Sequence, residues 1–470
     1  MADSLPDTTK QTPLPLGSDA RPVYGADEGT AAMAHDTHGG SPTSTAASDH
    51  DPTRGRWLLV AAAMLLQFAI GAVYAWSVFS KALQAAPPFH LSKLEASLPF
   101  EVTIGMVFIG TFIGGRIQDR RGPRTVALVG GLVYGVGVML ASFAHSHSQL
   151  WLLILGYGVI SGFGLGLAYI VPIAMLQKWF PDKRGLITGL AVGGFGFGAV
   201  LTAPVAQRLI GANSDVPTRA FLSLGVAYLV MSLVGASFFR NPPAGYTVPG
   251  YVPATTGRVV DSGRDYTQAE ALRTPQWYLL TAILTLNVVA GISLISQAAA
   301  AATDIAGYTK VGAASAVGVL ALFNGAGRIV WAGASDRIGR MPSFAAMLGL
   351  SGVCLLLLPH ASSAGLFFAL AAVVYLCYGG AFGTMPATAG DYFGVKNAGA
   401  IYGLMIIAWS IGGVVGPIIA AALIGSGKHY GTAYTTIAII ALVAVVLPFI
   451  TRMPRTRHNA EEGSLGAVRS

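Results

Sequence analysis

The sequence predicts an all-α integral membrane protein with twelve transmembrane helices in two pseudo-symmetric halves of six. Of its 470 residues, 53% are hydrophobic and only 11% are charged, whereas soluble domains carry about a quarter charged residues. Apolar runs of nearly twenty residues recur along the chain, and each can cross a hydrocarbon layer of about 30 Å as a helix. In lipid, backbone polar groups must be satisfied within their own segment, so these runs should be helical.

The apolar runs divide six and six around a polar segment. They lie at 57–80, 96–116, 124–144, 149–172, 185–210, 219–239, 276–301, 312–333, 343–360, 364–386, 398–423 and 431–451. The proline-bearing stretch 241–275 is predicted to be a cytoplasmic linker between bundles at 54–240 and 276–452. The low-complexity residues 1–53 predict a disordered cytoplasmic N-terminal tail, and 453–470 a cytoplasmic C-terminal tail.

The positive charges predict the orientation. With the N-terminus inside, fourteen Lys and Arg residues fall in inner loops and six in outer loops. Because basic loops stay on the cytoplasmic side, we expect both termini in the cytoplasm and a multi-pass protein of the bacterial inner (plasma) membrane. The same rule explains the net charge of +8. The basic residues are spread over loops, so the expected partner is the lipid bilayer and not nucleic acid.

The two halves share a repeated motif. The segment GRIQDRRG at 115–122 follows the second run, and AGASDRIG at 332–339 follows the eighth. Their aspartates, Asp119 and Asp336, are 217 residues apart, and Pro172 and Pro386 are 214 residues apart. These nearly equal offsets predict a duplicated six-helix unit, with a substrate site near the midplane between the halves.

The G-x-x-x-D-R-x-G motif and its twin resemble the signature loops of the major facilitator superfamily, and the resemblance extends over all twelve runs. It implies alternating access of the two halves, with gating roles for Asp119, Arg120, Asp336 and Arg337. An aspartate at a helix end can hold an arginine or the positive N-terminus of another helix. We expect a monomeric functional unit. The alternative is that both segments are ordinary basic loops.

Four further segments point to a narrower family. They are QFAIGAVYAWSVF at 67–79, KWFPDKRG at 178–185, TPQWY and LNVVAG within 274–291, and YFGVKNAGAIYG at 392–403. Together they resemble the oxalate/formate antiporter family, which includes lactate and pyruvate carriers and is similar to the eukaryotic monocarboxylate transporters. The resemblance implies a small organic anion as substrate without specifying which one.

Arg328 is the first candidate for a substrate-binding residue. A carboxylate in a dry cavity needs a fixed counter-charge, and arginine supplies a permanent charge in a fork that fits two oxygens. Arg328 lies inside the eighth run, where an ionisable side chain indicates function by default. Asn324 shares its helix face and is expected to assist it. The narrower resemblance also implies an arginine here; an ion-paired or snorkelling side chain is the alternative.

Aromatic residues complete the predicted site. Tyr74, Tyr169 and Trp409 are candidates to shape it or contact the substrate, and the resemblance implies a substrate-contacting tyrosine at Tyr169. Each could equally be a packing residue or an interface anchor. The oxalate exchanger of the resembling family has a lysine in the eleventh span, where Trp409 stands here. A dianion would therefore meet one counter-charge instead of two, which favours a monocarboxylate such as lactate, pyruvate or formate.

The sequence leaves the transport mode open between proton symport and anion exchange. Asp304 is the first candidate for a proton-coupling carboxylate and Glu101 the second, although a solvated carboxylate at a helix end is the plainer interpretation of Asp304. No convergent catalytic set appears in the runs, so we expect no enzyme activity, no metal and no cofactor. The alternatives are an oxalate/formate exchanger, a facilitator for an unrelated substrate such as a drug, and a transport-incompetent sensor.

Overall fold

The computed structural model describes residues 55–212, 215–250, 263–425 and 429–454. The predicted tail at 1–53 and nearly all of the predicted tail at 453–470 lie outside the described residues. Within the described ranges, twelve helices are long and apolar enough to cross a membrane. The predicted all-helical fold with twelve transmembrane helices is therefore confirmed.

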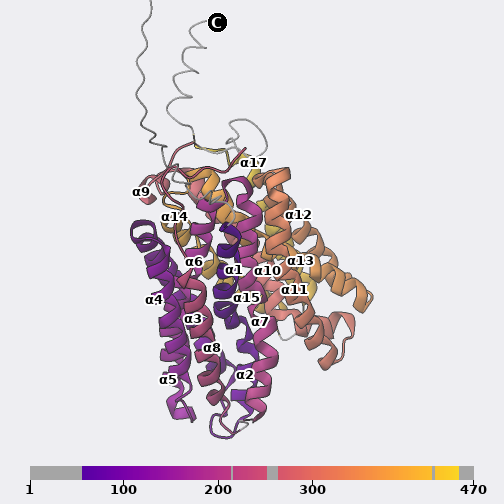
Figure 1. The fold of residues 1–470 in the computed structure, drawn as a ribbon. Helices are drawn as coiled ribbons and strands as arrows, with labels where there is room; N and C mark the ends of the chain where they lie inside the picture. The colour runs from indigo at the N-terminus through magenta and orange to yellow at the C-terminus, as the bar shows by residue number, and fades with distance from the viewer. Residues whose placement is uncertain (1–54, 213–214, 251–262, 426–428, 455–470) are drawn as a thin grey trace, which may run out of the picture. The chain divides into compact units, whose positions relative to one another are not determined.

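The first six spans form one bundle, coloured indigo to magenta in Figure 1. Span 1 is built from α1, η1 and α2, and span 4 from α5, η3 and α6; η3 is a π-helical segment. The elements of this half are α1 (Arg56–Gly71), η1 (Ala72–Ala75), α2 (Trp76–Ala85), α3 (Lys93–Arg121), α4 (Pro123–Ala141), η2 (His147–Gln149), α5 (Leu150–Leu153), η3 (Ile154–Ser161), α6 (Gly162–Trp179), η4 (Pro181–Lys183), α7 (Arg184–Ala212), η5 (Pro217–Arg219) and α8 (Ala220–Ser237).

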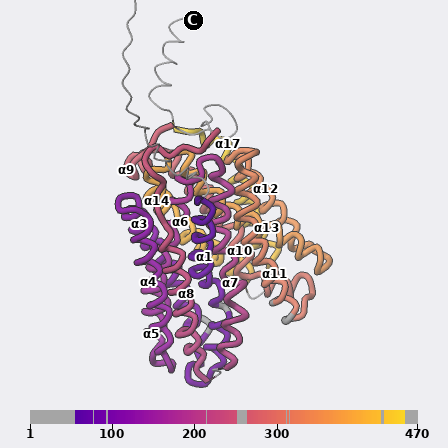
Figure 2. Tube along the Cα trace, in the orientation of Figure 1, coloured from indigo at the N-terminus to yellow at the C-terminus, as the bar shows by residue number. Residues whose placement is uncertain are grey.

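The second six spans form the other bundle, which Figure 2 traces in orange and yellow beyond the short helix α9. Span 11 is built from α14 and α15, and span 12 from α16 and α17. The elements are α9 (Gln268–Ala271), α10 (Pro275–Ala306), α11 (Lys310–Ile338), α12 (Arg340–Leu357), η6 (Leu358–His360), α13 (Ala364–Phe393), α14 (Ala398–Met405), α15 (Ile407–Ile424), α16 (Tyr430–Ala444) and α17 (Val446–Ile450).

The repeated motif lies mainly on helices and not in loops. The sequence placed the ends of the second and eighth spans at 116 and 333, but α3 continues to Arg121 and α11 to Ile338. The chain turns only at Gly122 and Gly339, whose φ angles of 87° and 98° favour glycine. Asp119 and Asp336 therefore lie on the last turns of their helices and can reach a neighbouring helix.

The halves meet where α3 packs on α14, and α7 packs on α11 and α13. Spans 2 and 11 thus pair across the halves as spans 8 and 5 do, which is the expected result of the duplication. We call the end that carries Arg56 and Thr451 the termini end.

Glycines bring α11 close to its neighbours on both sides. A Cβ atom at Gly189 or Gly383 would contact the backbone carbonyl oxygen of Arg328, and one at Gly379 that of Asn324. Small residues of this kind allow membrane helices to approach within backbone contact. They fix α11, and with it Arg328, between α7 and α13.

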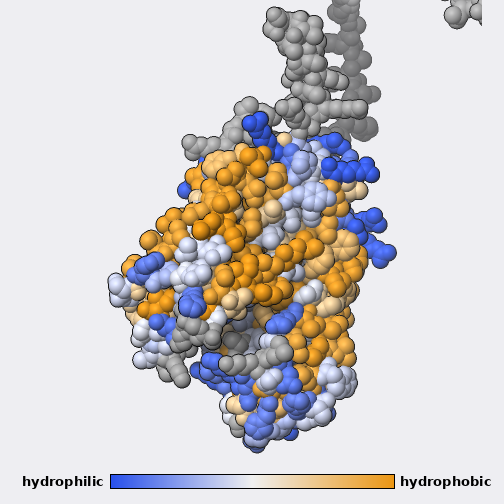
Figure 3. Space-filling model, turned by 180° about the vertical axis from the view of Figure 1, so that it is seen from behind, coloured by the Kyte–Doolittle hydropathy of each residue, from blue (hydrophilic) through white to orange (hydrophobic). Residues whose placement is uncertain are grey.

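Apolar side chains cover much of the outer surface. Figure 3 shows them as broad orange areas with blue residues toward the two ends. Exposed examples on the described helices include Val129 and Val136 of α4, Val230 of α8, and Val443 and Phe449 near the C-terminal end. Exposed apolar surface of this extent marks a lipid-facing protein.

The close packing of α11 against α13 yields a stability test. Gly383→Ala would force a Cβ atom into the backbone of α11, and we expect a loss of about 1–3 kcal/mol from overpacking. The measurement is the thermal unfolding midpoint of the purified protein in detergent. Gly365→Ala on the same helix is the matched control, because a Cβ there meets nothing within 4 Å and alanine favours a helix. Equal midpoints for the two variants would contradict this account of the packing.

Candidate functional site

A buried arginine lies between the two halves. The Arg328 side chain on α11 is 1% exposed, and its Nη1 donates to the carbonyl oxygen of Val192 on α7 at 3.3 Å. Within the described ranges, no carboxylate forms an ion pair with it. A buried cation without an acidic partner is costly, and an anion bound beside this guanidinium would lower that cost.

Aromatic rings from both halves surround this guanidinium. Its Cζ lies 5.5 Å from the ring centroid of Phe195 and 5.3 Å from that of Phe382, within the range of cation–π attraction. The rings also contact one another. Phe195 lies 5.3 Å from Tyr74 and 5.1 Å from Tyr169, and Phe382 lies 5.8 Å from Trp409 and 5.3 Å from Tyr378. We call these six rings the aromatic cluster.

Polar atoms in this region lack partners. The hydroxyl groups of Tyr74, Tyr169, Tyr378 and Tyr402 are close enough to Arg328 to interact with it electrostatically. Among the described residues, the hydroxyls of Tyr74, Tyr378 and Tyr402 and the Nε of Arg328 are buried and form no hydrogen bond of ordinary length, although they interact with neighbouring side chains at longer range. Buried polar groups are normally paired, so this set offers hydrogen-bonding groups that a polar ligand could use.

The structure brings Arg328, Tyr74, Tyr169 and Trp409 together, and their role in substrate binding stays a prediction. Asn324 lies one helical turn away, and its Oδ1 is buried without a hydrogen-bond partner among the described residues. This atom faces α13, since a Cβ at Gly379 would lie 2.7 Å from it. Asn324 therefore lines the boundary between α11 and α13 beside the aromatic cluster.

The two predicted proton-coupling residues lie elsewhere. Asp304 is exposed at the end of α10 away from the termini, and its Oδ2 accepts from the Tyr430 hydroxyl at 2.8 Å. Glu101 is exposed on α3 and accepts from Ser97 Oγ at 2.9 Å. Neither interacts with Arg328. Their coupling role stays a prediction, without support from contacts at the site.

The sequence did not identify Phe195, Tyr378 and Phe382 as residues of the site. Aromatic residues inside apolar runs resemble ordinary core residues, so composition did not distinguish them. One signal was available for Phe195, because it lies 214 residues before Trp409, the offset that relates the two halves. The two rings lie 6.3 Å apart and contact each other edge to face across the boundary between the halves.

The repeated aspartates both cap helices of the opposite half. Asp336 accepts from the backbone N–H groups of Gly185 and Leu186 at 2.9 Å each, at the start of α7. Asp119 accepts from the N–H of Ala400 at 2.8 Å, near the start of α14. Carboxylates are stabilised at helix N-termini by unpaired N–H groups and the helix dipole. We call these two contacts the Asp336 latch and the Asp119 latch.

The neighbouring arginines of the motif do not take part in the latches. Arg120 and Arg337 are exposed, so their predicted gating role finds no contact that supports it. Lys178 instead approaches Asp119, with Nζ 3.8 Å from Oδ1.

A buried charge network completes the Asp336 latch. Asp391 on α13 pairs with Arg184 at 3.0 Å and with Arg340 at 2.7 Å, and Arg340 also pairs with Asp336 at 2.8 Å. Asp391 is 2% exposed. In the first half the position 214 residues earlier is Gln177, which only donates to the carbonyl of Pro386 at 3.1 Å. The two latches are therefore built differently.

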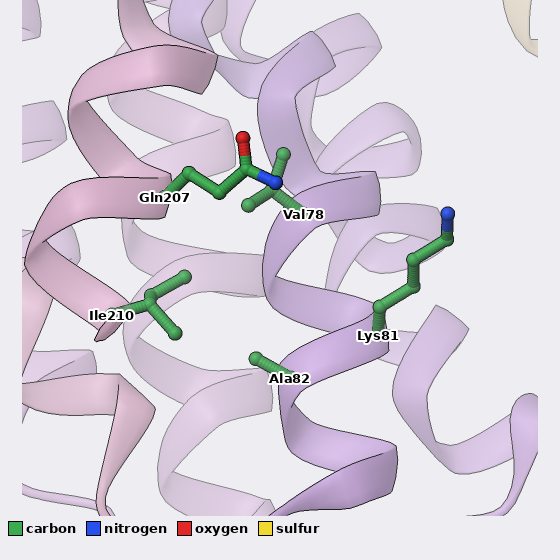
Figure 4. Close-up of a pocket in the computed structure, with 5 residues that line it drawn as sticks. All are labelled: Val78, Lys81, Ala82, Gln207 and Ile210. Carbon is green, nitrogen blue, oxygen red and sulfur yellow. The ribbon is translucent and has the colours of Figure 1, made fainter. Parts of the chain in front are cut away.

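A small pocket lies between α2 and α7, toward the end opposite the termini. Its volume is about 260 Å³, and it is lined by Val78, Lys81, Ala82, Gln207 and Ile210. In Figure 4 the Gln207 and Ile210 side chains point toward α2, whereas Lys81 points away from them. Val78 follows Tyr74 of the aromatic cluster by about one helical turn, but no residue of the cluster lines the pocket.

Comparison with known proteins gives several relatives. The chain is 30% identical to "Uncharacterized MFS-type transporter YhjX" of Escherichia coli over 77% of this chain and 86% of that protein. It is 27% identical to the "Oxalate:formate antiporter" of Oxalobacter formigenes over 85% and 93%. It is also 27% identical to "Apicoplast pyruvate carrier 1" of Toxoplasma gondii over 76% and 75%.

The fold and the family agree. The fucose transporter FucP, solved in the outward conformation, superposes with a TM-score of 0.65 at 17% identity, covering 85% of this chain and all of that one; at this identity the likeness shows the fold alone. The family model of the Major Facilitator Superfamily matches residues 56–341 and 291–468. This chain therefore belongs to the major facilitator superfamily, among relatives that include an oxalate:formate antiporter.

Proposed function

We propose that the protein is a secondary carrier of small organic anions and that its substrate is a monocarboxylate such as lactate, pyruvate or formate. The observation that carries the proposal is Arg328, buried between the halves without an acidic partner among the described residues. A guanidinium binds a carboxylate through two parallel hydrogen bonds. The buried tyrosine hydroxyls beside it can donate further bonds to the same oxygens.

The charge and size of the site favour a small monoanion. Arg328 supplies one positive charge, and the eleventh span presents the neutral Trp409 to the aromatic cluster. A bound monocarboxylate would neutralise the site, whereas a dianion would leave one charge buried and unpaired. The rings of Tyr74, Phe195 and Phe382 restrict the room for an apolar substituent. Oxalate/formate exchange is the second candidate, because a relative over most of the chain bears that name.

Anion exchange is the transport mode that the contacts support better. Within the described ranges, no carboxylate interacts with Arg328, so no acidic residue there could neutralise it when the substrate leaves. An empty site would carry its charge through the membrane interior at considerable cost. Exchange of one anion for another avoids that state. Proton symport would need a carboxylate such as Asp304 or Glu101 to act from a distance.

The latches serve as gates in this mechanism. The Asp119 latch and the Asp336 latch both join the halves at the termini end, so opening that end requires breaking them. The positive-inside pattern supports a cytoplasmic termini end, and the proposed location is the bacterial inner membrane. One chain supplies both halves and the residues of the proposed site, which supports a monomeric functional unit.

The transport proposal predicts the behaviour of Arg328 variants. In liposomes containing the purified protein, we expect uptake of labelled lactate, pyruvate or formate that is stimulated by unlabelled monocarboxylate inside. Arg328→Ala should lower this uptake at least about tenfold, since a hydrogen bond to a charged group contributes about 1.5–3 kcal/mol to binding. Arg208→Ala, which removes an exposed arginine of α7 near the end opposite the termini, is the control and should retain it.

Other results would change the proposal in defined ways. Uptake driven by an inward proton gradient with an empty interior would replace exchange by symport. Uptake that persists in Arg328→Ala would show that Arg328 does not bind the substrate. Uptake of none of these anions by folded protein would overturn the substrate class while leaving the fold in place.

The charge network at the Asp336 latch predicts unequal effects in the two halves. Asp391→Asn would remove the buried carboxylate that pairs with both Arg184 and Arg340, and breaking a buried pair typically costs about 3–5 kcal/mol. Gln177→Ala, at the equivalent position, removes one neutral hydrogen bond of about 1 kcal/mol. We expect a much lower thermal midpoint or folded yield for Asp391→Asn. Similar values for the two variants would show that the network does not stabilise the closed termini end.

A further inference from the structure

The chain between the two halves folds into an ordered element at 263–274. Thr267 caps α9, since its Oγ1 accepts from the N–H of Glu270 at 3.2 Å and Glu270 accepts from the N–H of Thr267 at 2.7 Å. The hydrogen bond from the N–H of Thr267 lowers the pKa of the Glu270 carboxyl, so this carboxylate stays ionised at neutral pH. A reciprocal cap of this kind fixes the start of a helix, which gives this short helix a defined position.

This segment is tied to the second half. The N–H of Tyr266 donates to the carbonyl of Phe393 at 2.8 Å, and Asn397 Nδ2 donates to the carbonyl of Tyr266 at 2.7 Å. The N–H of Lys396 donates to Asp265 Oδ1 at 3.0 Å. All three bonds involve the turn between α13 and α14. The start of α9 therefore moves with the beginning of span 11.

Gln268 then bridges to the first half. Its Oε1 accepts from Nε of Arg116 at 2.7 Å, and its Nε2 donates to the carbonyl of Ala400 at 2.6 Å. The N–H of the same Ala400 donates to Asp119. Arg116 and Asp119 lie about one turn apart on α3. Asp119, Ala400, Gln268 and Arg116 thus form a closed ring across the boundary between the halves.

In the part of the chain that the structure describes, no element like α9 reinforces the Asp336 latch. The Asp336 latch is completed by the buried pairs of Asp391 with Arg184 and Arg340, whereas the Asp119 latch has Gln177 in place of Asp391. A single connection joins the two halves, so it can reinforce only one of the latches. It lies at the latch that lacks the buried acid.

We propose that α9, through Gln268, is a strap that fastens the Asp119 latch and sets how often the termini end opens. The proposal rests on the alternating-access function proposed above. When span 11 moves away from α3, α9 moves with it, so the bond of Gln268 to Arg116 and the Asp119–Ala400 bond must break together. The strap therefore makes the connecting segment part of the gate, and any modification or binding event that displaces α9 would favour opening at that end.

The test is hydrogen–deuterium exchange of the full-length protein in lipid nanodiscs, followed by mass spectrometry of peptides covering 398–405. For Gln268→Ala we expect about tenfold faster exchange there, which corresponds to about 1.4 kcal/mol and to the loss of one or two hydrogen bonds. Gln268→Glu can still accept from Arg116 but cannot donate to the Ala400 carbonyl, so it should also exchange faster. Gln149→Ala, which removes a glutamine bonded to the N–H of His145 at 2.6 Å near the opposite end, should resemble the unmodified protein.

The outcomes separate the strap from the transport proposal, because the readout needs no substrate. Unchanged exchange at 398–405 in Gln268→Ala would overturn the strap, and so would a Gln268→Glu protein that behaves like the unmodified one. Faster exchange over α4 as well as α14 would indicate general destabilisation and would also count against it. Failure of monocarboxylate uptake, with the exchange result as expected, would leave the strap standing.

Discussion

The buried positive charge of Arg328 is the constraint on which the arrangement of the bundle depends. A guanidinium at the middle of a membrane protein must be compensated, and here the carbonyl of Val192 and the faces of Phe195 and Phe382 provide the compensation. They can approach only because glycines line both neighbours of α11. A Cβ at Gly196 would lie 3.3 Å from Nε of Arg328, and one at Gly383 would contact its backbone. The position of the buried charge therefore depends on the close packing of α7, α11 and α13.

The two latches use the same physical contact with different reinforcement. Each aspartate takes N–H groups at the start of a helix in the opposite half, where such groups have no partner within their own helix. Around Asp336 the reinforcement comes from buried ion pairs, which are strong when complete and costly when broken. Around Asp119 it comes from the hydrogen bonds of Gln268 with Arg116 and with the Ala400 carbonyl, together with Lys178 at a longer distance. We infer that the Asp119 side yields more easily, which would make it the first part of the termini end to separate.

Much of the fold could be predicted from the sequence because membrane spans are read from length and hydropathy alone. The duplicated motif and its offset identified Asp119 and Asp336, and Arg328 was conspicuous as a charge within an apolar run. The rest depended on three-dimensional contacts. Tyr378 and Phe382 have no feature that separates a site wall from a packed core, and the π-helical segment of span 4 has no sequence signal. The role of Asp391 could not be predicted from the sequence, since its partners Arg184 and Arg340 are distant in sequence.

The site and the Asp336 latch share the same pair of helices, which offers a route by which substrate can influence the gate. Arg328 and Asp336 lie about two turns apart on α11, and their partners Val192 and Leu186 lie at a similar spacing on α7. An anion bound to Arg328 would compete with the Val192 carbonyl for the guanidinium. Losing that bond would loosen α7 from α11 in the middle of the contact, while the latch still holds its end. Because a ligand shifts a conformational equilibrium only through differential contacts, this exchange of partners is the contact through which a carboxylate could promote the movement that carries it.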